Sequence, residues 1–169
     1  MHREYHLFCQ ADPFFYDLPS PMNDFATVPP PADWRCVDDH EWRSRAPKCA
    51  GLPAQGWKIH VSGCPDNAER LIGLVHRYCV PRGIAFKFLR GPHAVFQRNA
   101  KYAPRAGSGK VVTIYPCDVA ELERVCGELG AALAGEHGPY ILSDVRIGAG
   151  PLYVRYGGFA RRDCVTADG

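Results

Sequence analysis

Residues 56–63 read GWKIHVSG, a short stretch in which apolar and polar side chains alternate. Successive side chains of a β-strand point to opposite faces, so this alternation predicts a strand that buries its three apolar residues on one face. Lys58 and His60 then lie together on the other face. Two cationic or proton-handling groups that lie side by side repel one another, and the pair therefore indicates a site that an anion visits.

Strands and amphipathic helices follow this stretch along the chain. Apolar side chains recur at helical spacing over residues 65–80 and 118–134, and predict two helices. The second helix begins with Asp118 and Glu121, a capping-box type of start. Further strands are predicted at residues 84–89, 110–116, 140–144 and 151–157. About five or more strands and two main helices, which do not alternate strictly, predict a single α+β domain with a mostly antiparallel sheet.

The N-terminal part of the chain differs in composition. Residues 11–53 are rich in proline and aromatic side chains and show no sustained periodicity. We therefore expect residues 1–55 to form an irregular segment packed on the domain, residues 56–160 to form its core, and residues 161–169 to form a linker. Packing is favoured over a peptide-binding surface as the role of the aromatic anchors in this segment, which are Phe14, Phe15, Tyr16, Trp34 and Trp42.

The overall composition excludes several classes of protein. The chain of 169 residues has a formal net charge of only +2, so a protein that binds nucleic acid through its overall charge is not expected. No apolar run approaches the roughly 20 residues that span a membrane, and the N-terminus has no signal-peptide core, which predicts a cytoplasmic protein. The eight cysteines have no CxxC-type spacing, the closest pair being Cys117 and Cys126, so we expect reduced thiols and no metal site.

One lysine interrupts an apolar strand. Lys87 lies between Phe86 and Phe88. A lysine in the middle of a strand is unfavourable unless its side chain reaches solvent or has a function. In a half-buried pocket beside other cations, desolvation and like charge lower the pKa of a lysine, which makes it a base near neutral pH. An edge-strand lysine that simply reaches water is the alternative.

Other charged residues are predicted to lie near these strands. Guanidinium and ammonium groups gathered at one place form a phosphate-binding pocket that needs no metal, although each group taken singly is more often a solvated surface charge. The candidates are Lys101, Arg105, Lys110, Arg146 and Arg155. Asp144, at the end of the run YILSD, is expected to orient the ring of His60 and raise its pKa, unless it only caps the strand.

A series of motifs occurs along the chain in a fixed order. The motifs are GWKIHVS, FKFL, the run N-x-K-x-x-x-R-x-G-S-G-K, TIYP, GPYILSD and RYGGF. Together with the opening FCQADPFFYD, they resemble the N-terminal lyase domain of class III lanthipeptide synthetases over nearly the whole chain. Class IV synthetases share this domain, and both are similar to the phosphothreonine lyase effectors of pathogenic bacteria. The resemblance implies a phosphothreonine-lyase-like fold and a C-terminal linker that leads toward a kinase domain absent from this chain.

The resemblance also implies an activity, the elimination of phosphate from phosphoserine or phosphothreonine in a precursor peptide to give dehydroalanine or dehydrobutyrine. By this resemblance Lys58 steadies the developing enolate, His60 is the general acid and Lys87 is the general base. The implied partners are the phosphorylated precursor peptide and the kinase and cyclase domains of the same synthetase. No cofactor, nucleic acid or membrane is implied.

The same resemblance assigns roles to the residues around these three. Arg105 and Arg155 resemble the phosphate-clamping arginines, and Asp144 resembles the aspartate that positions the histidine. Tyr115 resembles a tyrosine near the site. The further phosphate-binding candidates, which match the family less closely, are Lys101, Lys110 and Arg146.

Two other functions remain open from the sequence. A non-catalytic module that binds phosphopeptide or leader peptide would need the arginines, but it would have no need for Lys87 and His60 together. A hydrolase with a thiol nucleophile would use Cys64, which precedes Pro65 at a helix start where a thiolate would be stabilised. The G-x-x-x-x-x-R loop of such a nucleophile does not follow Cys64, which argues against a hydrolase.

Overall fold

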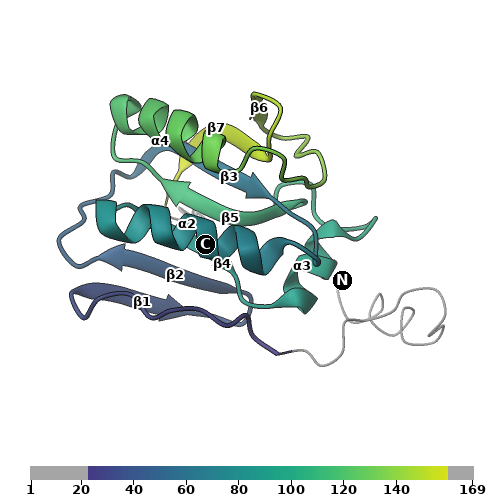
Figure 1. Cartoon of the computed structure of the whole chain (residues 1–169), viewed down its shortest axis with the longest axis horizontal. Helices are drawn as coiled ribbons and strands as arrows, with labels where there is room; N and C mark the ends of the chain where they lie inside the picture. The colour runs from purple at the N-terminus through teal and green to yellow at the C-terminus, as the bar shows by residue number, and fades with distance from the viewer. Residues whose placement is uncertain (1–22, 160–169) are drawn as a thin grey trace, which may run out of the picture.

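The computed structural model describes residues 23–159, which form one seven-stranded sheet with helices packed against it (Figure 1). The strands lie in the order β1-β2-β4-β5-β3-β7-β6, and each neighbouring pair is antiparallel. This arrangement confirms the prediction of a single α+β domain with a mostly antiparallel sheet. The strands are β1 (Trp34–Asp38), β2 (Trp42–Pro47), β3 (Gln55–Ser62), β4 (Ala85–Leu89), β5 (Lys110–Tyr115), β6 (Val145–Ile147) and β7 (Leu152–Gly158).

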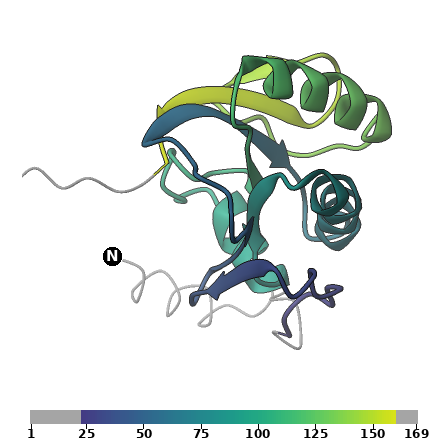
Figure 2. The same cartoon turned by 90° about the vertical axis from the view of Figure 1, so that its left-hand side faces the viewer.

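The two predicted helices lie on one face of the sheet, as Figures 1 and 2 show. They are α2 (Ala68–Cys79) and α4 (Val119–Ala132). Asp118 caps α4, because its carboxylate accepts a hydrogen bond from the backbone N–H of Glu121 at 2.8 Å. The predicted start of this helix is therefore confirmed.

The hydrophobic core lies between this face of the sheet and the two helices. Ile59 and Val61 of β3 are fully buried there, together with apolar side chains from α2 and α4. Burial of one such side chain stabilises the fold by about 1.5–3 kcal/mol. Because alternate residues of a strand point to the other side, the polar side chains of β3, Lys58 and His60, lie on the face that α2 and α4 do not cover.

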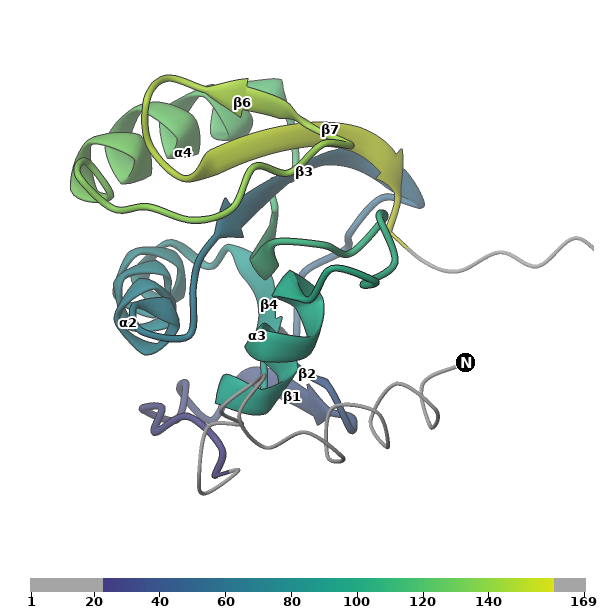
Figure 3. The same cartoon turned by 90° about the vertical axis from the view of Figure 1, so that its right-hand side faces the viewer.

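A third helix, α3 (Pro92–Asn99), is not predicted from the sequence and lies beside β4 and β5 (Figure 3). It buries only Ala94 and Val95, too few positions for a helical period to be visible in the sequence. A short 3₁₀ helix, η1 (Val80–Arg82), extends α2. Among residues 23–159, no helix combines the length and the apolar surface needed to cross a bilayer.

The prediction of an irregular segment over residues 11–53 is wrong for the hairpin of β1 and β2. β2 pairs with β4, with Ser44 opposite Lys87, so the hairpin extends the sheet. β1 is an edge strand in which only Trp34 is buried. Because neither of its faces is covered along its length, apolar and polar residues do not alternate in its sequence. The predicted anchors Phe14, Phe15 and Tyr16 and the predicted linker 161–169 lie outside the described residues.

The strand predicted over residues 140–144 is also wrong. These residues form a loop, and the strand begins one residue later as β6. Ile141 is fully buried whereas Leu142 is 70% exposed, so this apolar run presents no single face to the core. The loop instead carries Asp144 back to β3.

Candidate active site

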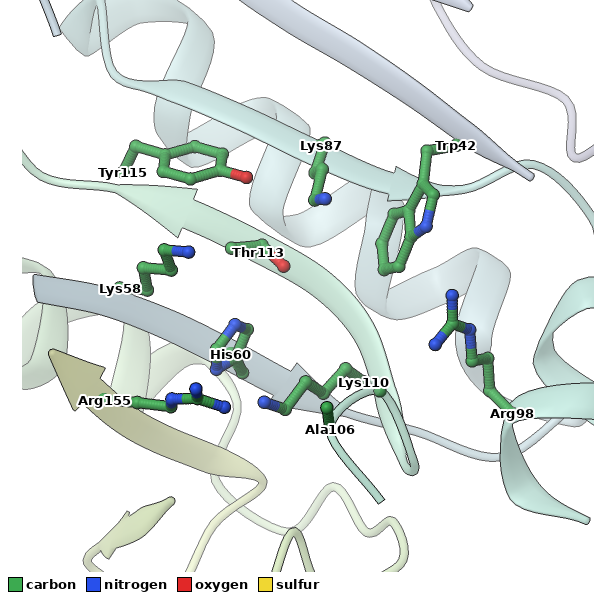
Figure 4. A pocket seen from close by; sticks show the side chains of 11 residues that line it. Trp42, Lys58, His60, Lys87, Arg98, Ala106, Lys110, Thr113, Tyr115 and Arg155 are labelled. Atoms are coloured by element: carbon green, nitrogen blue, oxygen red, sulfur yellow. The ribbon is translucent and has the colours of Figure 1, made fainter. Parts of the chain in front are cut away.

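A polar pocket of about 270 Å³ lies on the sheet face opposite α2 and α4 (Figure 4). Strands β3, β4, β5 and β7 line it, and β2, α3 and the turn over residues 101–109 contribute the remaining side chains. Three lysines, two arginines and one histidine make the pocket strongly cationic. The lining residues are Trp42, Lys58, His60, Lys87, Arg98, Ala106, Gly107, Lys110, Thr113, Tyr115 and Arg155.

The register of the sheet determines the spacing of the central residues. Thr113 of β5 pairs with Lys87 of β4 on one side and with His60 of β3 on the other. The Cα atoms of Lys87 and His60 are therefore two strand spacings apart, about 10 Å, with both side chains on the pocket face. In the same way, Lys58 of β3 pairs with Arg155 of β7. The side chains of two lysines, one arginine and one histidine are thus held at defined intervals by backbone hydrogen bonds.

A β-bulge brings Lys110 to the pocket. Val61 of β3 pairs with Val112 of β5, but the next pair is Ser62 with Lys110, so Val111 is left out of the ladder. Simple alternation would place Lys110 in the core together with Val112. The extra residue reverses the alternation, so that both valines are buried in the core while Lys110 lines the pocket.

The carboxylate of Asp144 holds two cations at one end of the pocket. Its side chain has no exposed surface and accepts hydrogen bonds from Nδ1 of His60, from Nζ of Lys110 at 3.0 Å and from the hydroxyl of Ser143 at 2.7 Å. Burial raises the pKa of a carboxyl group, but these hydrogen bonds outweigh burial and lower the pKa of Asp144 to about 2. The ionised carboxylate makes Nδ1 of His60 the donor, which leaves Nε2 as the ring nitrogen available to a substrate.

Asp144 raises the pKa of His60, as predicted, but other contributions are larger and the net shift is downward. His60 is only 5% exposed, and this burial lowers the pKa of its ring. The hydrogen bond to Asp144 opposes this effect, and the charges of Lys110 and Lys58 add to it. The imidazole is therefore neutral at neutral pH as long as no anion enters the pocket.

Burial also lowers the pKa values of the three lysines that line the pocket. For Lys58, the positive charges of Lys87, Arg155 and Lys110 add to desolvation. For Lys110, the hydrogen bond to Asp144 opposes desolvation without cancelling it. The pKa of Lys87 is lowered as well, which is the direction expected of a lysine in a half-buried cationic pocket.

Two aromatic side chains and one further arginine complete the walls. Burial raises the pKa of Tyr115 to about 12, so its hydroxyl stays protonated. The ring of Trp42 lies with its centroid 4.4 Å from Nζ of Lys87. Arg98 forms two hydrogen bonds, of 2.6 and 2.5 Å, to the carboxylate of Glu41. Sequence reasoning missed Trp42 and Arg98 as site residues because they come from β2 and α3, which it does not predict.

Three predicted phosphate-binding residues do not line the pocket. Lys101 and Arg105 are exposed in the turn that borders it, and Nζ of Lys101 lies 5.5 Å from the ring of Tyr102. The two residues after Arg105 do line the pocket, so Arg105 stands at its rim. Arg146 is exposed on β6 and donates hydrogen bonds to the carbonyls of Ala149 and Gly150.

The alternative nucleophile Cys64 is separate from the pocket. Burial and the charge of Asp66 raise the pKa of this thiol, contrary to the expectation of a stabilised thiolate. Cys64, Asp66 and His137 place potential ligand atoms within 4.8 Å of one another. Asp66 and His137 are, however, largely exposed and already pair with each other at 3.6 Å, a contact typical of a surface ion pair.

Comparison with solved structures relates the fold to known enzymes. The phosphothreonine lyase SpvC, an effector protein from Salmonella, aligns with 82% of this chain and 73% of its own, at a TM-score of 0.53 and 16% identity. The type III effector and phosphothreonine lyase OspF from Shigella flexneri aligns with 95% of this chain and 91% of its own, at a TM-score of 0.48 and 15% identity. The likeness to SpvC shows that the fold is phosphothreonine-lyase-like.

Comparison of sequences relates the chain to a larger protein. The chain is 53% identical, over 179 aligned positions, to the probable SapB synthase of Streptomyces coelicolor. The alignment covers 100% of this chain and 19% of that synthase, so the chain spans about a fifth of the length of its relative. The family model described as "RamC, N-terminal domain" matches residues 22–169. The chain therefore belongs to the family of RamC N-terminal domains.

Proposed function

We propose that this domain is a lyase that removes phosphate by β-elimination from phosphoserine or phosphothreonine residues of a lanthipeptide precursor peptide. The observation that carries the proposal is the placement of Lys87 and His60 on either side of Thr113, in a pocket lined largely by cations. Phosphate binding alone needs only the cations. Elimination also needs a base and an acid that act on neighbouring atoms of one substrate.

The charge of the pocket suits a phosphate monoester, which carries a charge of about −1.5 to −2 at neutral pH. Arg155 and Lys110 line the pocket on the side of His60, and Arg98 lines it on the side of Lys87. Guanidinium groups form paired hydrogen bonds with phosphate oxygens, and the anion relieves the mutual repulsion of the cations. We assign phosphate binding to these three residues and place Arg105 at the rim, where the rest of the peptide would pass.

The reaction then needs no group beyond these side chains. The neutral amine of Lys87 takes the proton from Cα, and the electron pair of that bond forms the Cα–Cβ double bond. The Cβ–O bond breaks, and its electron pair leaves with the phosphate, which takes a proton from Nε2 of His60. Burial lowers the pKa of Lys87, which favours the neutral amine that this step uses.

Lys58 is assigned to the negative charge that develops on the carbonyl oxygen next to Cα. Lys58 lies two residues before His60 on the same strand face. Lys58 as the hydrogen-bond donor and His60 as the acid are therefore directed at the same substrate. Such a donor acts mainly in the transition state, where the charge on the oxygen is largest. Tyr115, with its protonated hydroxyl, is a second donor from the neighbouring strand.

The low pKa of His60 in the empty pocket is compatible with its role as an acid. A phosphate dianion beside the ring favours the protonated imidazolium, because an opposite charge within about 4–6 Å raises the pKa of a histidine. The substrate thus creates the charge state that its own departure requires. Asp144 keeps the ring oriented throughout.

The synthase relative is longer than this chain, and we extend the proposal to its context. A kinase of the same polypeptide would supply the phosphorylated precursor, and a cyclase would add cysteine thiols to the dehydrated residues. This order follows from the chemistry of the product, because a dehydroamino acid is an acceptor for thiols. The proposed substrate is therefore a peptide already phosphorylated on serine or threonine.

The test uses a synthetic phosphoserine peptide. Elimination leaves a peptide lighter by the mass of phosphoric acid, and the product adds a small thiol. Hydrolysis would instead leave a serine peptide that adds no thiol, and it would refute the proposal.

Two variants separate a lyase from a binding module. Lys87→Ala is expected to lower turnover by about 10²–10⁴-fold while phosphopeptide affinity changes little. Arg77→Ala, on the exposed face of α2, is the matched control and should behave as wild type. Binding by the wild-type domain without any turnover would favour the alternative, a non-catalytic phosphopeptide- or leader-binding module.

A further inference from the structure

We propose that the indole of Trp42 positions the amine of Lys87 for proton abstraction, an inference that rests on the proposed function. Nζ of Lys87 lies 4.4 Å from the centroid of the indole ring. A cation at this distance over the face of a tryptophan is attracted by the negative face of the ring. Figure 4 shows Lys87 and Trp42 together at one end of the pocket, away from Arg155.

The turn between β1 and β2 holds the indole in place. The carboxylate of Asp39 accepts hydrogen bonds from the backbone N–H of Glu41 at 2.8 Å and of Trp42 at 2.6 Å. The ring N–H of Trp42 donates to the carboxylate of Glu41 at 3.1 Å. Both the backbone and the ring of Trp42 are therefore fixed, which is what a positioning residue requires.

Arg98 is tied to the same arrangement. Its Cζ lies 5.6 Å from the centroid of the Trp42 ring, and Glu41 accepts two hydrogen bonds from its guanidinium group. Glu41 thus binds the ring N–H and the arginine at once. Lys87, which is nearer to the ring, is the cation that the indole face contacts most directly.

The electrostatic surroundings of Lys87 contain opposing contributions. The charged groups that face it are Asp39 and Glu41 from the β1–β2 turn, Arg98 from α3, Lys110 from β5 and Lys58 from β3. Burial and the cations favour the neutral amine, whereas the two carboxylates favour the ammonium ion. The indole face acts in the same direction as the carboxylates. Loss of the ring should therefore leave Lys87 less basic and less well aimed.

The first experiment measures the titration of Lys87 without any substrate. Lysine labelled with ¹³C at Cε is followed by NMR, and the Lys87 signal is identified by its absence in Lys87→Arg. In Trp42→Leu the pKa of Lys87 is expected to fall by about half a unit to one and a half units. Trp42→Phe keeps an aromatic face and should restore most of the wild-type value.

A second experiment removes the attraction and keeps the packing. Fluorinated tryptophan, incorporated in place of the three tryptophans of the chain, has the shape of tryptophan but a less negative ring face. It should lower the pKa of Lys87 in the wild-type chain. The same incorporation into Trp42→Phe is the matched control and should leave the Lys87 titration unchanged.

The kinetic experiment links the contact to the reaction. In Trp42→Leu, kcat for elimination is expected to fall about tenfold, and the acidic limb of the pH profile of kcat/KM should move to lower pH. Trp42→Phe should recover most of both. Trp57→Phe controls for the loss of a tryptophan as such, because Trp57 packs on the core side of β3 and contacts Tyr156.

The outcomes distinguish this inference from the proposed function. A Lys87 titration that does not respond to Trp42→Leu or to fluorination overturns the role of Trp42, even if the wild-type domain eliminates phosphate. A wild-type domain that does not eliminate phosphate overturns the proposed function, and the titration still decides whether the indole acts on Lys87. Trp42→Leu protein that fails to fold is replaced by the fluorinated chain, in which packing is retained.

Discussion

Nδ1 of His60 is hydrogen-bonded to the carboxylate of Asp144, which lies 84 positions further along the chain. The loop that carries Asp144 is docked on β3, since the hydroxyl of Ser62 donates a hydrogen bond to the carbonyl of Pro139. Lys110, which reaches the pocket through a β-bulge, donates to the same carboxylate at 3.0 Å. One buried carboxylate therefore orders the end of the cationic pocket that holds His60 and Lys110.

Substitution of this anion should impair the chemical step. Asp144→Asn is expected to lower kcat about 100-fold with little change in KM, because an uncharged amide no longer stabilises the protonated ring of His60 and can also donate to Nδ1, which disturbs the tautomer. The measurement is single-turnover release of phosphate from a phosphoserine peptide. Ser143→Ala removes only a neighbouring hydroxyl that donates to Asp144 and should cost tenfold or less. An Asp144→Asn domain with wild-type kcat would contradict the role given to this pair.

The same carboxylate should make the fold sensitive to acid. The pKa of Asp144 falls from an ordinary 3.8 to about 2 in the fold, which corresponds to about 2 kcal/mol of stability. A lowered carboxyl pKa gives stability that is present above 3.8 and is lost as the pH falls toward 2. The pKa of His60, also lowered, acts in the same direction below 6.5. Denaturant unfolding at a series of pH values should show a shallower acid dependence in Asp144→Asn, whereas Asp66→Asn, at an exposed carboxylate, should follow wild type.

Inorganic phosphate should stabilise the domain. The cations of the pocket repel one another when it is empty, and an anion that binds the folded state adds about 2.7 kcal/mol at a concentration of 100 times its Kd. Thermal unfolding should therefore shift upward with phosphate at constant ionic strength. Arg155→Ala should reduce this shift, and Arg77→Ala on the opposite side of the molecule should leave it intact. An equal shift with chloride would indicate general screening and contradict a specific anion site.

A side chain at Gly107 should displace the guanidinium group of Arg98. A Cβ atom at this position would lie 1.6 Å from a terminal nitrogen of Arg98, so the guanidinium group would have to move. Gly107→Ala is expected to raise KM for the phosphopeptide several-fold while the melting temperature changes little, because the displaced group is the end of a flexible side chain. Gly51→Ala is the control, since a Cβ there meets no atom within 4 Å. An unchanged KM would remove Arg98 from the phosphate-binding group.

The central strands and the two long helices could be predicted because their patterns are local. Apolar and polar residues alternate in the sequence of β3 from Trp57 onward, and the capping residues Asp118 and Glu121 mark the start of α4 within four positions. Alternation also places Thr113 on the same strand face as Tyr115. Threonine is common in strands, however, so its presence there does not indicate a functional site.

The rest of the site depends on contacts that are distant in the sequence. Trp42 joins the pocket only because β2 pairs with β4, and the edge strand β1 beside it shows no alternation. The bulge at Val111 reverses the side on which Lys110 lies, and nothing in the run KVVTIY marks it. The direction of the His60 pKa shift depends on how deeply the ring is buried, which only the folded structure determines.

The β-ladder across β4, β5 and β3 has a consequence for how such domains diversify. The groups proposed to exchange protons stand on hydrogen-bonded backbone, whereas α3 and the turn over residues 101–109 contribute pocket residues from outside the sheet. If the proposed function holds, exchanges at the exposed positions of the turn, such as Lys101 and Arg105, would change which peptides are accepted while the groups on the sheet keep their places. Catalytic competence and peptide preference would then be separable traits, open to independent evolution and to independent engineering.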